Sequence, residues 1–414
     1  MSVKRHVIAA LSLGLVVMLA GCSGAPNELL AKPVADLQTA APDVAQAQDI
    51  SAFGERLFAA VAANGDKNPV ISPLSVFYAL GMAYEGARGD TAAAFQQVLG
   101  LTAEQARQIA AYLLATLAAP GQGTTLNTAD SVWLDSKLTA QQTWVDAVSG
   151  YYKAQVFNTD LQAPDTLVAV NKWINDATNG LIPQMLDRID STTVVMLINA
   201  LYMKAAWAQP FDTNLSSVSN FTVASGQQVQ ADFMTANYDT RSYFDTPDAE
   251  GVVIPYQDGR LAFLVALPKG TLTLGGNTIA GLLADAKDTE NVGFSMPKFD
   301  TEFGLDLLPA LVQMGLEPAC DLSADFSGLG TSTAGPLYIG LVAHKVSMSV
   351  GEKGTEAAAA TVIAVDSGGS ISPPAMHWIN FDHPYLYAVV DTTTGIPLFI
   401  GQMDDPSLAP PAVS

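Results

Sequence analysis

The second half of the chain is dominated by apolar, β-branched runs that are typical of buried strands. The run at 192–201 is almost uninterruptedly apolar, and similar runs are found at 252–255, 261–267, 292–297, 337–350 and 385–400. The first half instead has apolar residues at helical spacing, in residues 50–63, 75–85 and 91–99. Because helical patterns come first and strand patterns later, without regular alternation, the sequence predicts an α+β fold.

The composition is that of a folded, strongly acidic protein. Of the 414 residues, 49% are hydrophobic and 14% are charged, which is enough to build a large core. The 40 acidic residues outnumber the 19 basic ones, so the net charge of -21 would repel a phosphate backbone, and we expect no nucleic-acid partner. Residues 49–405 contain no linker, repeat or low-complexity tract, which predicts one domain.

The chain begins with a segment typical of an export signal. Two basic residues precede an apolar run over residues 7–20, which is too short to span a bilayer stably. The run ends in Leu19-Ala20-Gly21-Cys22, which resembles the bacterial lipoprotein box, where signal peptidase cuts before a lipid-modified cysteine. We predict a signal peptide over residues 1–21 and a lipid anchor at Cys22, which places the protein in the cell envelope. Ser23 favours the outer membrane where one exists. The alternative is an ordinary secretory signal.

The segments that flank the predicted domain have biased compositions. Residues 22–48 are rich in Ala, Pro and Gln, which is typical of a flexible tether that lifts a domain off a lipid surface. Residues 406–414 form a Pro-rich tail. Cys320 is the only cysteine besides Cys22, so lipidation of Cys22 would leave no intramolecular disulfide. We interpret Cys320 as a small, partly buried apolar residue.

The sequence is poor in catalytic patterns. It has four histidines, and the carboxylates around them show no metal spacing. The motifs of zinc metalloproteases, nucleophile elbows and phosphate-binding loops do not occur in it. We therefore expect a protein that is not an enzyme and that uses no cofactor or metal. An envelope hydrolase, with a Ser-His-Asp triad assembled from distant residues, is the third interpretation of the chain.

One segment is chemically unusual. Residues 351–365 read Gly-Glu-Lys-Gly-Thr-Glu-Ala-Ala-Ala-Ala-Thr-Val-Ile-Ala-Val, which on propensity alone would form a short helix. The segment, however, follows a strand-like run and leads into residues 366–374, whose Gly, Ser and Pro content is typical of an exposed loop. Small side chains let such a segment lie in solvent or slide into a sheet, where bulky inward side chains would block it.

The same segment resembles a known family. Gly354-Thr355-Glu356-Ala357-Ala358-Ala359-Ala360-Thr361 is similar to the hinge of the reactive-centre loop of inhibitory serpins, and Glu352 stands where that family usually has a glutamate. Phe381-Asp382-His383-Pro384-Tyr385-Leu386-Tyr387 resembles the family signature, with Tyr385 where Phe is usual. Further similar blocks occur in serpin order at 68–75, 86–91, 171–174, 198–204, 207, 210–212 and 296–299. The resemblance covers nearly the whole chain after the tether.

The resemblance implies a single α+β domain with three β-sheets, eight or nine helices and an exposed reactive-centre loop. It also implies a monomeric, irreversible inhibitor whose partner is a serine protease or, as a second class, a papain-like cysteine protease. The protease cleaves the loop and is trapped as an acyl-enzyme when the hinge inserts into sheet A as a new strand. On insertion, alternate hinge residues would turn to one face, where small groups avoid overpacking, namely Thr355, Ala357, Ala359 and Thr361.

The resemblance also assigns residues outside the loop. The family's shutter, which hydrogen-bonds beneath the opening strands, corresponds to Ser72, Ser75, Asn199 and His344. Trp207 matches the tryptophan at the breach, where insertion begins. Lys298 and Glu352 match an ion pair found in some serpins. For each shutter residue, the alternative interpretation is ordinary hydrogen bonding in a core.

The reactive bond has two candidate positions. Counting from Gly354 places it between Gly368 and Gly369, and counting back from residues 382–384 places it near Ser370 and Ile371. Both positions put small residues in the recognition pocket, which favours elastase-like or subtilisin-like proteases. A trypsin-like target is disfavoured, because the loop has no Lys or Arg after its start. The runner-up function is a non-inhibitory serpin that acts as a binding or scaffold protein.

Overall fold

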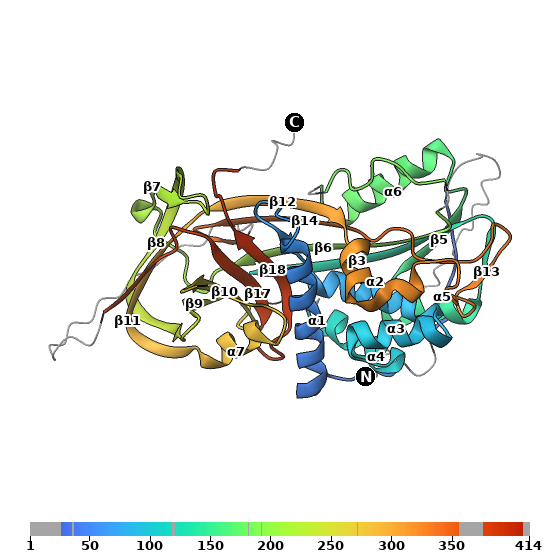
Figure 1. Ribbon diagram of the computed structural model, residues 1–414, viewed down its shortest axis with the longest axis horizontal. Coiled ribbons are helices and arrows are strands. Elements are labelled where there is room, and N and C mark those ends of the chain that lie inside the picture. Colours follow the sequence, from blue (N-terminus) through green and yellow to red (C-terminus); the bar gives the residue numbers. More distant parts are fainter. Residues whose placement is uncertain are drawn as a thin grey trace, which may run out of the picture.

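The structure, a computed structural model, describes most of the chain after the predicted signal peptide (Figure 1). The described residues are 26–34, 37–117, 121, 123–180, 182–191, 193–270, 272–355 and 376–408. The predicted signal peptide and Cys22 lie outside them. The same holds for residues 356–375, which include most of the predicted hinge and both candidate reactive bonds, and for residues 409–414.

Eight α-helices form within the described residues, and the three helical patterns of the first half are all confirmed. The helices are α1 (Val44–Ala62), α2 (Pro73–Gly86), α3 (Gly89–Leu99), α4 (Ala103–Leu117), α5 (Gln142–Tyr151), α6 (Pro164–Ala177), α7 (Thr278–Asp285) and α8 (Leu308–Leu311). Helix α2 is buried almost all round, because nearly every one of its residues is apolar or small.

A seven-stranded sheet, called sheet A here, runs along the molecule (Figure 1). Its strands lie in the order β1 (Asn27–Glu28), β5 (Gln155–Thr159), β3 (Thr124–Asp135), β6 (Val195–Ala206), β15 (Gly354–Thr355), β14 (Ala343–Gly351) and β12 (Phe299–Asp306). Strand β6 contains most of the predicted buried run at 192–201. It pairs antiparallel with β3 along its length, from Val195 opposite Leu134 to Ala205 opposite Thr124.

The second sheet, called sheet B here, is built from the later strands. Its order is β16 (His377–Asn380), β11 (Lys287–Pro297), β8 (Gln228–Asp245), β9 (Ala249–Pro255), β10 (Leu261–Pro268), β17 (Tyr385–Asp391), β18 (Pro397–Met403) and β2 (Val70–Ile71), and β7 (Ser217–Thr222) pairs with β8. A two-stranded sheet joins β4 (Leu138–Ala140) to β13 (Gly330–Ser332). The described residues thus form three sheets, and the predicted α+β class is confirmed.

Two predicted strand runs have wrong boundaries. Residues 337–342 are apolar but not strand, because Leu337, Ile339 and Val342 fill the core as irregular chain before β14 begins. The run at 385–400 is two strands, β17 and β18, separated by a turn. That turn contains Gly395 at φ +74°, a conformation that favours glycine.

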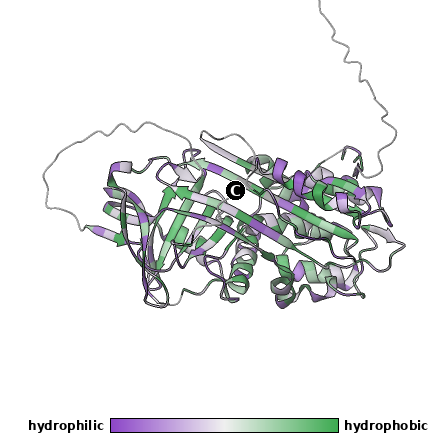
Figure 2. Ribbon diagram, turned by 90° about the horizontal axis from the view of Figure 1, so that it is seen from above, coloured by the Kyte–Doolittle hydropathy of each residue, from purple (hydrophilic) through white to green (hydrophobic). Residues whose placement is uncertain are grey.

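The core fills both faces of sheet A. Figure 1 shows α6 on one face of the sheet and α2 to α5 on the other. On the α6 side, Val170 and Ile174 pack against Trp133 and Met196 in a separate apolar cluster. The larger cluster joins the remaining helices to sheet B. Figure 2 shows the hydrophobic residues along these interior strands and more hydrophilic residues on the outer elements.

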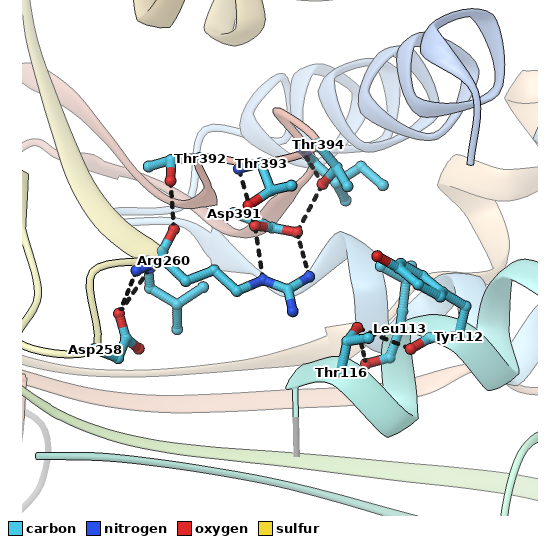
Figure 3. A network of polar contacts seen from close by, with 11 residues as sticks. Tyr112, Leu113, Thr116, Asp258, Arg260, Asp391, Thr392, Thr393 and Thr394 are labelled. Atoms are coloured by element: carbon cyan, nitrogen blue, oxygen red, sulfur yellow. Dashed lines mark hydrogen bonds and ion pairs between the residues drawn. The ribbon is translucent and has the colours of Figure 1, made fainter. Parts of the chain in front are cut away.

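A buried ion pair closes the turn between β17 and β18 (Figure 3). Asp391 is fully buried and accepts hydrogen bonds from Nε and Nη2 of Arg260, at 3.0 and 2.8 Å. It also accepts from the backbone N–H of Thr393 at 3.1 Å and from the hydroxyl of Thr394 at 2.9 Å. A carboxylate with four donors is well compensated for its burial.

Part of the predicted tether packs against the domain, so the flexible tether expected over residues 22–48 is wrong for these positions. Strand β1 pairs with β5 at the edge of sheet A, and the backbone N–H of Lys32 donates to Asp146 at 2.7 Å. Helix α1 begins at Val44. An edge strand offers free backbone groups, which this segment uses whatever its composition.

Among the described residues, the helices are all too short or too polar to cross a membrane.

Candidate functional site at the top of sheet A

The first residues of the predicted hinge already lie inside sheet A. Gly354 and Thr355 form β15, which pairs antiparallel with β14 on one side and β6 on the other. No ladder joins β6 directly to β14 within the described residues. Gly354 has φ +143°, and a Cβ there would lie 2.0 Å from the carbonyl oxygen of Ala205. Only glycine therefore fits at the point where the chain enters the sheet.

The side chain of Thr355 is buried against an aromatic pair. Thr355 is 1% exposed, and its hydroxyl lies 2.6 Å from the hydroxyl of Tyr256. The Tyr256 ring stacks on Trp207, with ring centroids 4.7 Å apart. Burial raises the pKa of Tyr256 well above its usual value, so the phenol stays neutral. Thr355 is thus buried and held by a neutral hydrogen bond to Tyr256.

Trp207 fixes the turn that precedes β15. Its indole Nε1 donates to the carbonyl oxygen of Gly351 at 2.9 Å, and its backbone N–H donates to the carbonyl oxygen of Lys353 at 3.0 Å. The backbone N–H of Phe211 donates to the carbonyl oxygen of Glu352 at 2.8 Å. Three donors from one short segment, residues 207–211, therefore hold residues 351–353.

The ion pair between Lys298 and Glu352 is present. Lys298 Nζ lies 3.1 Å from Glu352 Oε1, and the hydroxyl of Ser216 donates to the same oxygen at 2.8 Å. Partial burial raises the pKa of the Glu352 carboxyl, but the hydrogen bond from Ser216 and the nearby Lys298 outweigh burial, so the net shift is downward. The carboxylate therefore stays ionised and anchors the start of the loop.

The four predicted shutter residues form one buried network under sheet A. Ser72 caps α2 by accepting from the backbone N–H of Ser75 at 3.2 Å, and its own N–H donates to His344 Nε2 at 3.0 Å. The Ser75 hydroxyl donates to Asn199 Oδ1, and the amide of Asn199 donates to Asp130. Helix α2 is thus linked through side chains to β3, β6 and β14, the strands on both sides of β15.

The two titratable groups of this network are shifted in opposite directions by burial. Burial lowers the pKa of His344 to about 4, so the imidazole is neutral and can accept the N–H of Ser72. Burial raises the pKa of Asp130 to about 7, and the hydrogen bond from Asn199 only partly offsets this. Each group therefore avoids a buried charge over much of the acidic range.

We predict that Asp130→Asn stabilises the fold at neutral pH. Between about pH 4 and about pH 7, folded Asp130 keeps a proton that the unfolded chain releases, so its contribution to stability falls as the pH rises. Asparagine at position 130 keeps an oxygen that accepts the hydrogen bond from Asn199, and its contribution to stability does not fall as the pH rises. The gain over wild type should therefore grow by roughly 4 kcal/mol through this window and level off above it.

Thermal unfolding of both proteins from about pH 4 to about pH 8 checks this. His344 acts in the opposite sense, since its contribution is lost as the pH falls from about 6.5 to about 4, but it is common to both proteins and cancels in the difference. If the difference in unfolding midpoint between wild type and Asp130→Asn does not change with pH, the carboxyl of Asp130 does not keep its proton in the folded protein as proposed.

Three residues of the site were not predicted from the sequence: Asp130, Ser216 and Tyr256. Nothing in their local sequence marks them, because each acts on a partner far away along the chain. Among the described residues, no group of three His, Cys, Asp or Glu side chains could hold a metal ion. Cys320 is half-buried, and burial raises its pKa to about 11, which leaves an unreactive thiol.

Comparison with known proteins agrees with this geometry. The chain matches the serpin family, described as serine protease inhibitor, over residues 48–406. An uncharacterised serpin-like protein of Thermococcus kodakarensis is 31% identical over 370 residues, which cover 86% of this chain and 85% of that protein. Serpin-ZXA of Oryza sativa subsp. japonica is 32% identical over 389 residues, which cover 87% and 97%.

Solved structures share the whole fold. The crystal structure of the thermophilic serpin tengpin in its native state superposes with a TM-score of 0.83 at 28% identity, covering 92% of this chain and 99% of that one. The TM-score against tengpin in the latent state is 0.75 at 27% identity, covering 89% of this chain and 99% of that one. The arrangement of helices and sheets is thus the predicted one, and this chain belongs to the serpin family.

Proposed function

We propose that this protein is an inhibitory serpin that traps a protease by inserting its hinge into sheet A. The observation that carries the proposal is β15, since the hinge already enters the sheet between β6 and β14 at Gly354 and Thr355. Insertion of the following residues would extend a ladder that has begun. Each added backbone hydrogen bond contributes about 1 kcal/mol net, and a full strand adds many of them.

The residues after Thr355 suit this insertion. Glu356 is followed by Ala357, Ala358, Ala359, Ala360 and Thr361. Because side chains alternate across a strand, the inward positions after Thr355 would be taken by alanines and a threonine, which need little room. The score of 0.83 against native tengpin, against 0.75 for the latent form, supports a starting state that has not yet undergone the rearrangement.

The proposed target is a serine protease of elastase-like or subtilisin-like specificity, with papain-like cysteine proteases as the second class. Both candidate bonds, Gly368-Gly369 and Ser370-Ile371, present small residues to the recognition pocket. The relatives include a plant serpin and an insect protein named as a serine protease inhibitor, Serine protease inhibitor 42Dd of Drosophila melanogaster, at 30% identity.

The decisive test is incubation of the mature protein with pancreatic elastase or subtilisin. An inhibitory serpin gives an SDS-stable complex with the protease, and mass spectrometry of the released peptide locates the reactive bond within residues 366–371. Cleavage of the loop without any covalent complex would contradict the proposal. It would favour a non-inhibitory serpin that acts as a binding or scaffold protein. Turnover of a generic ester or peptide substrate without self-cleavage would favour a hydrolase.

We also propose that the protein is exported and anchored to a bacterial membrane through lipid on Cys22, and that it acts as a monomer. The support is the sequence Leu19-Ala20-Gly21-Cys22 after a short apolar run. Expression of the full chain in a bacterial host should place it in the membrane fraction, labelled by radioactive palmitate. Cys22→Ala should lose the label. A label that survives this substitution would contradict the anchor.

A further inference from the structure

Two aromatic rings lie exposed next to each other where the reactive-centre loop rejoins the fold. Tyr238 on β8 and Trp378 on β16 are each 42% exposed, and their ring centroids are 5.4 Å apart. Met376, the residue before β16, is 61% exposed. Large apolar side chains gathered on a surface mark sites of interaction more often than isolated ones do. These three residues are called the aromatic surface below.

The aromatic surface is held in a fixed geometry. The indole Nε1 of Trp378 donates to Asn380 Oδ1 at 2.8 Å, and the same oxygen accepts from the hydroxyl of Ser295 at 2.8 Å. A Cβ at Gly293 on β11 would lie 2.6 Å from the indole ring, so the glycine allows the ring to lie flat against the strand. A large ring that is already ordered loses little conformational entropy on binding, which is typical of binding hot spots.

The length of the loop sets how far a bound protease can be from this surface. Ile371 and Met376 are five residues apart, so the chain between them spans at most about 18 Å, and from Gly369 the limit is about 25 Å. A protease of about 250 residues has a radius of gyration of about 18 Å. A protease whose active site holds either candidate bond can therefore reach β16, which pairs with β11 at the end of the molecule where Figure 1 shows β8 and β11.

The charge around the surface indicates what kind of protease surface fits. The chain carries a net charge of -21, and Asp239, beside Tyr238, is exposed. The faces of aromatic rings attract cations, and tryptophan does so most strongly. We propose that Tyr238, Trp378 and Met376 form a secondary docking surface for the rim of the target protease's active-site cleft, where that rim presents apolar and basic side chains. This inference rests on the proposed inhibitory function.

Association kinetics test the proposal. We expect Trp378→Ala and Tyr238→Ala each to lower the second-order rate constant of covalent complex formation with pancreatic elastase or subtilisin, by about tenfold for Trp378. The number of inhibitor molecules consumed per protease should stay unchanged, because the hinge is untouched. Leu322→Ala is the matched control, since Leu322 is 70% exposed and lies in the segment between α8 and β13. Figure 1 shows β13 at the opposite end of the molecule from β8 and β11.

The outcomes separate this inference from the proposed function. If wild type forms covalent complexes and both variants form them at the wild-type rate, the docking surface is wrong and the inhibitory function stands. If wild type forms no complex, both are wrong. A wild-type dimer that dissociates on Trp378→Ala would overturn the inference by showing that the surface binds a second copy. Tyr238→Ala keeps the test valid if Trp378→Ala lowers the unfolding temperature, because Tyr238 takes no part in the contact with Gly293.

Discussion

Replacement of Thr355 by arginine is expected to turn the inhibitor into a substrate. Thr355 is 1% exposed, hydrogen-bonds to Tyr256, and lies between β14 and β6 at the point where the sheet opens. An arginine there would place a charge at a buried position, which costs several kcal/mol unless it is paired. The hinge would then fail to insert within the lifetime of the acyl-enzyme. Covalent complex should disappear from SDS gels, while the loop is still cut and the protease is released active.

Thr355→Ser is the matched control, because it keeps the hydroxyl that Tyr256 contacts and adds no bulk. This variant should still form the covalent complex with nearly the wild-type yield. An arginine variant that also traps the protease at the wild-type yield would show that the start of β15 is not the route of insertion, and the mechanism proposed for this chain would have to be abandoned.

Removal of the Asp391 carboxylate is expected to lower the free energy of unfolding strongly. Asp391→Ala leaves the guanidinium of Arg260 without its partner and removes the acceptor for Thr393 and Thr394, which close the turn between β17 and β18 (Figure 3). The Arg260 side chain is 25% exposed, so water replaces part of the lost interaction. The free energy of unfolding should fall by about 3 kcal/mol or more, measured by denaturant unfolding.

An exposed ion pair supplies the control for this experiment. The side chains of Lys172 and Asp176, one turn apart on α6, are 71% and 59% exposed. Asp176→Ala should change the free energy of unfolding by less than about 0.5 kcal/mol, because solvent screens such pairs. Equal losses for Asp391→Ala and Asp176→Ala would mean that burial of the Asp391 carboxylate does not determine its contribution.

The sequence was sufficient for the elements whose side-chain pattern is periodic and locally complete. The run at 192–201 became part of β6, and the helical spacing at 50–63 became part of α1. The apolar pattern gave a wrong prediction where buried residues form no regular helix or strand. Residues 337–342 are apolar because they fill the core as irregular chain. A short apolar run of this kind has the same sequence pattern as a buried strand.

The site residues that were predicted came from the resemblance to serpins, and those that were missed lie outside its motifs. Tyr256 and Thr355 are 99 residues apart, and Asp130 and Asn199 are 69 apart, so neither contact leaves a local signal. A tyrosine before a turn and an aspartate inside a strand are ordinary in sequence. Their roles follow only from the pairing of sheet A, which brings β3, β6 and β14 together around β15.

The most direct measurement is the heat resistance of the protein before and after its loop is cut. Trace subtilisin should nick the chain within residues 366–371, as mass spectrometry can verify, and the freed hinge should then continue the strand that begins at Gly354. About ten added hydrogen bonds at about 1 kcal/mol each predict a rise in the unfolding midpoint of roughly 13 °C for a domain of this length. A cut protein that unfolds at the same temperature as the intact one, or below it, would contradict insertion.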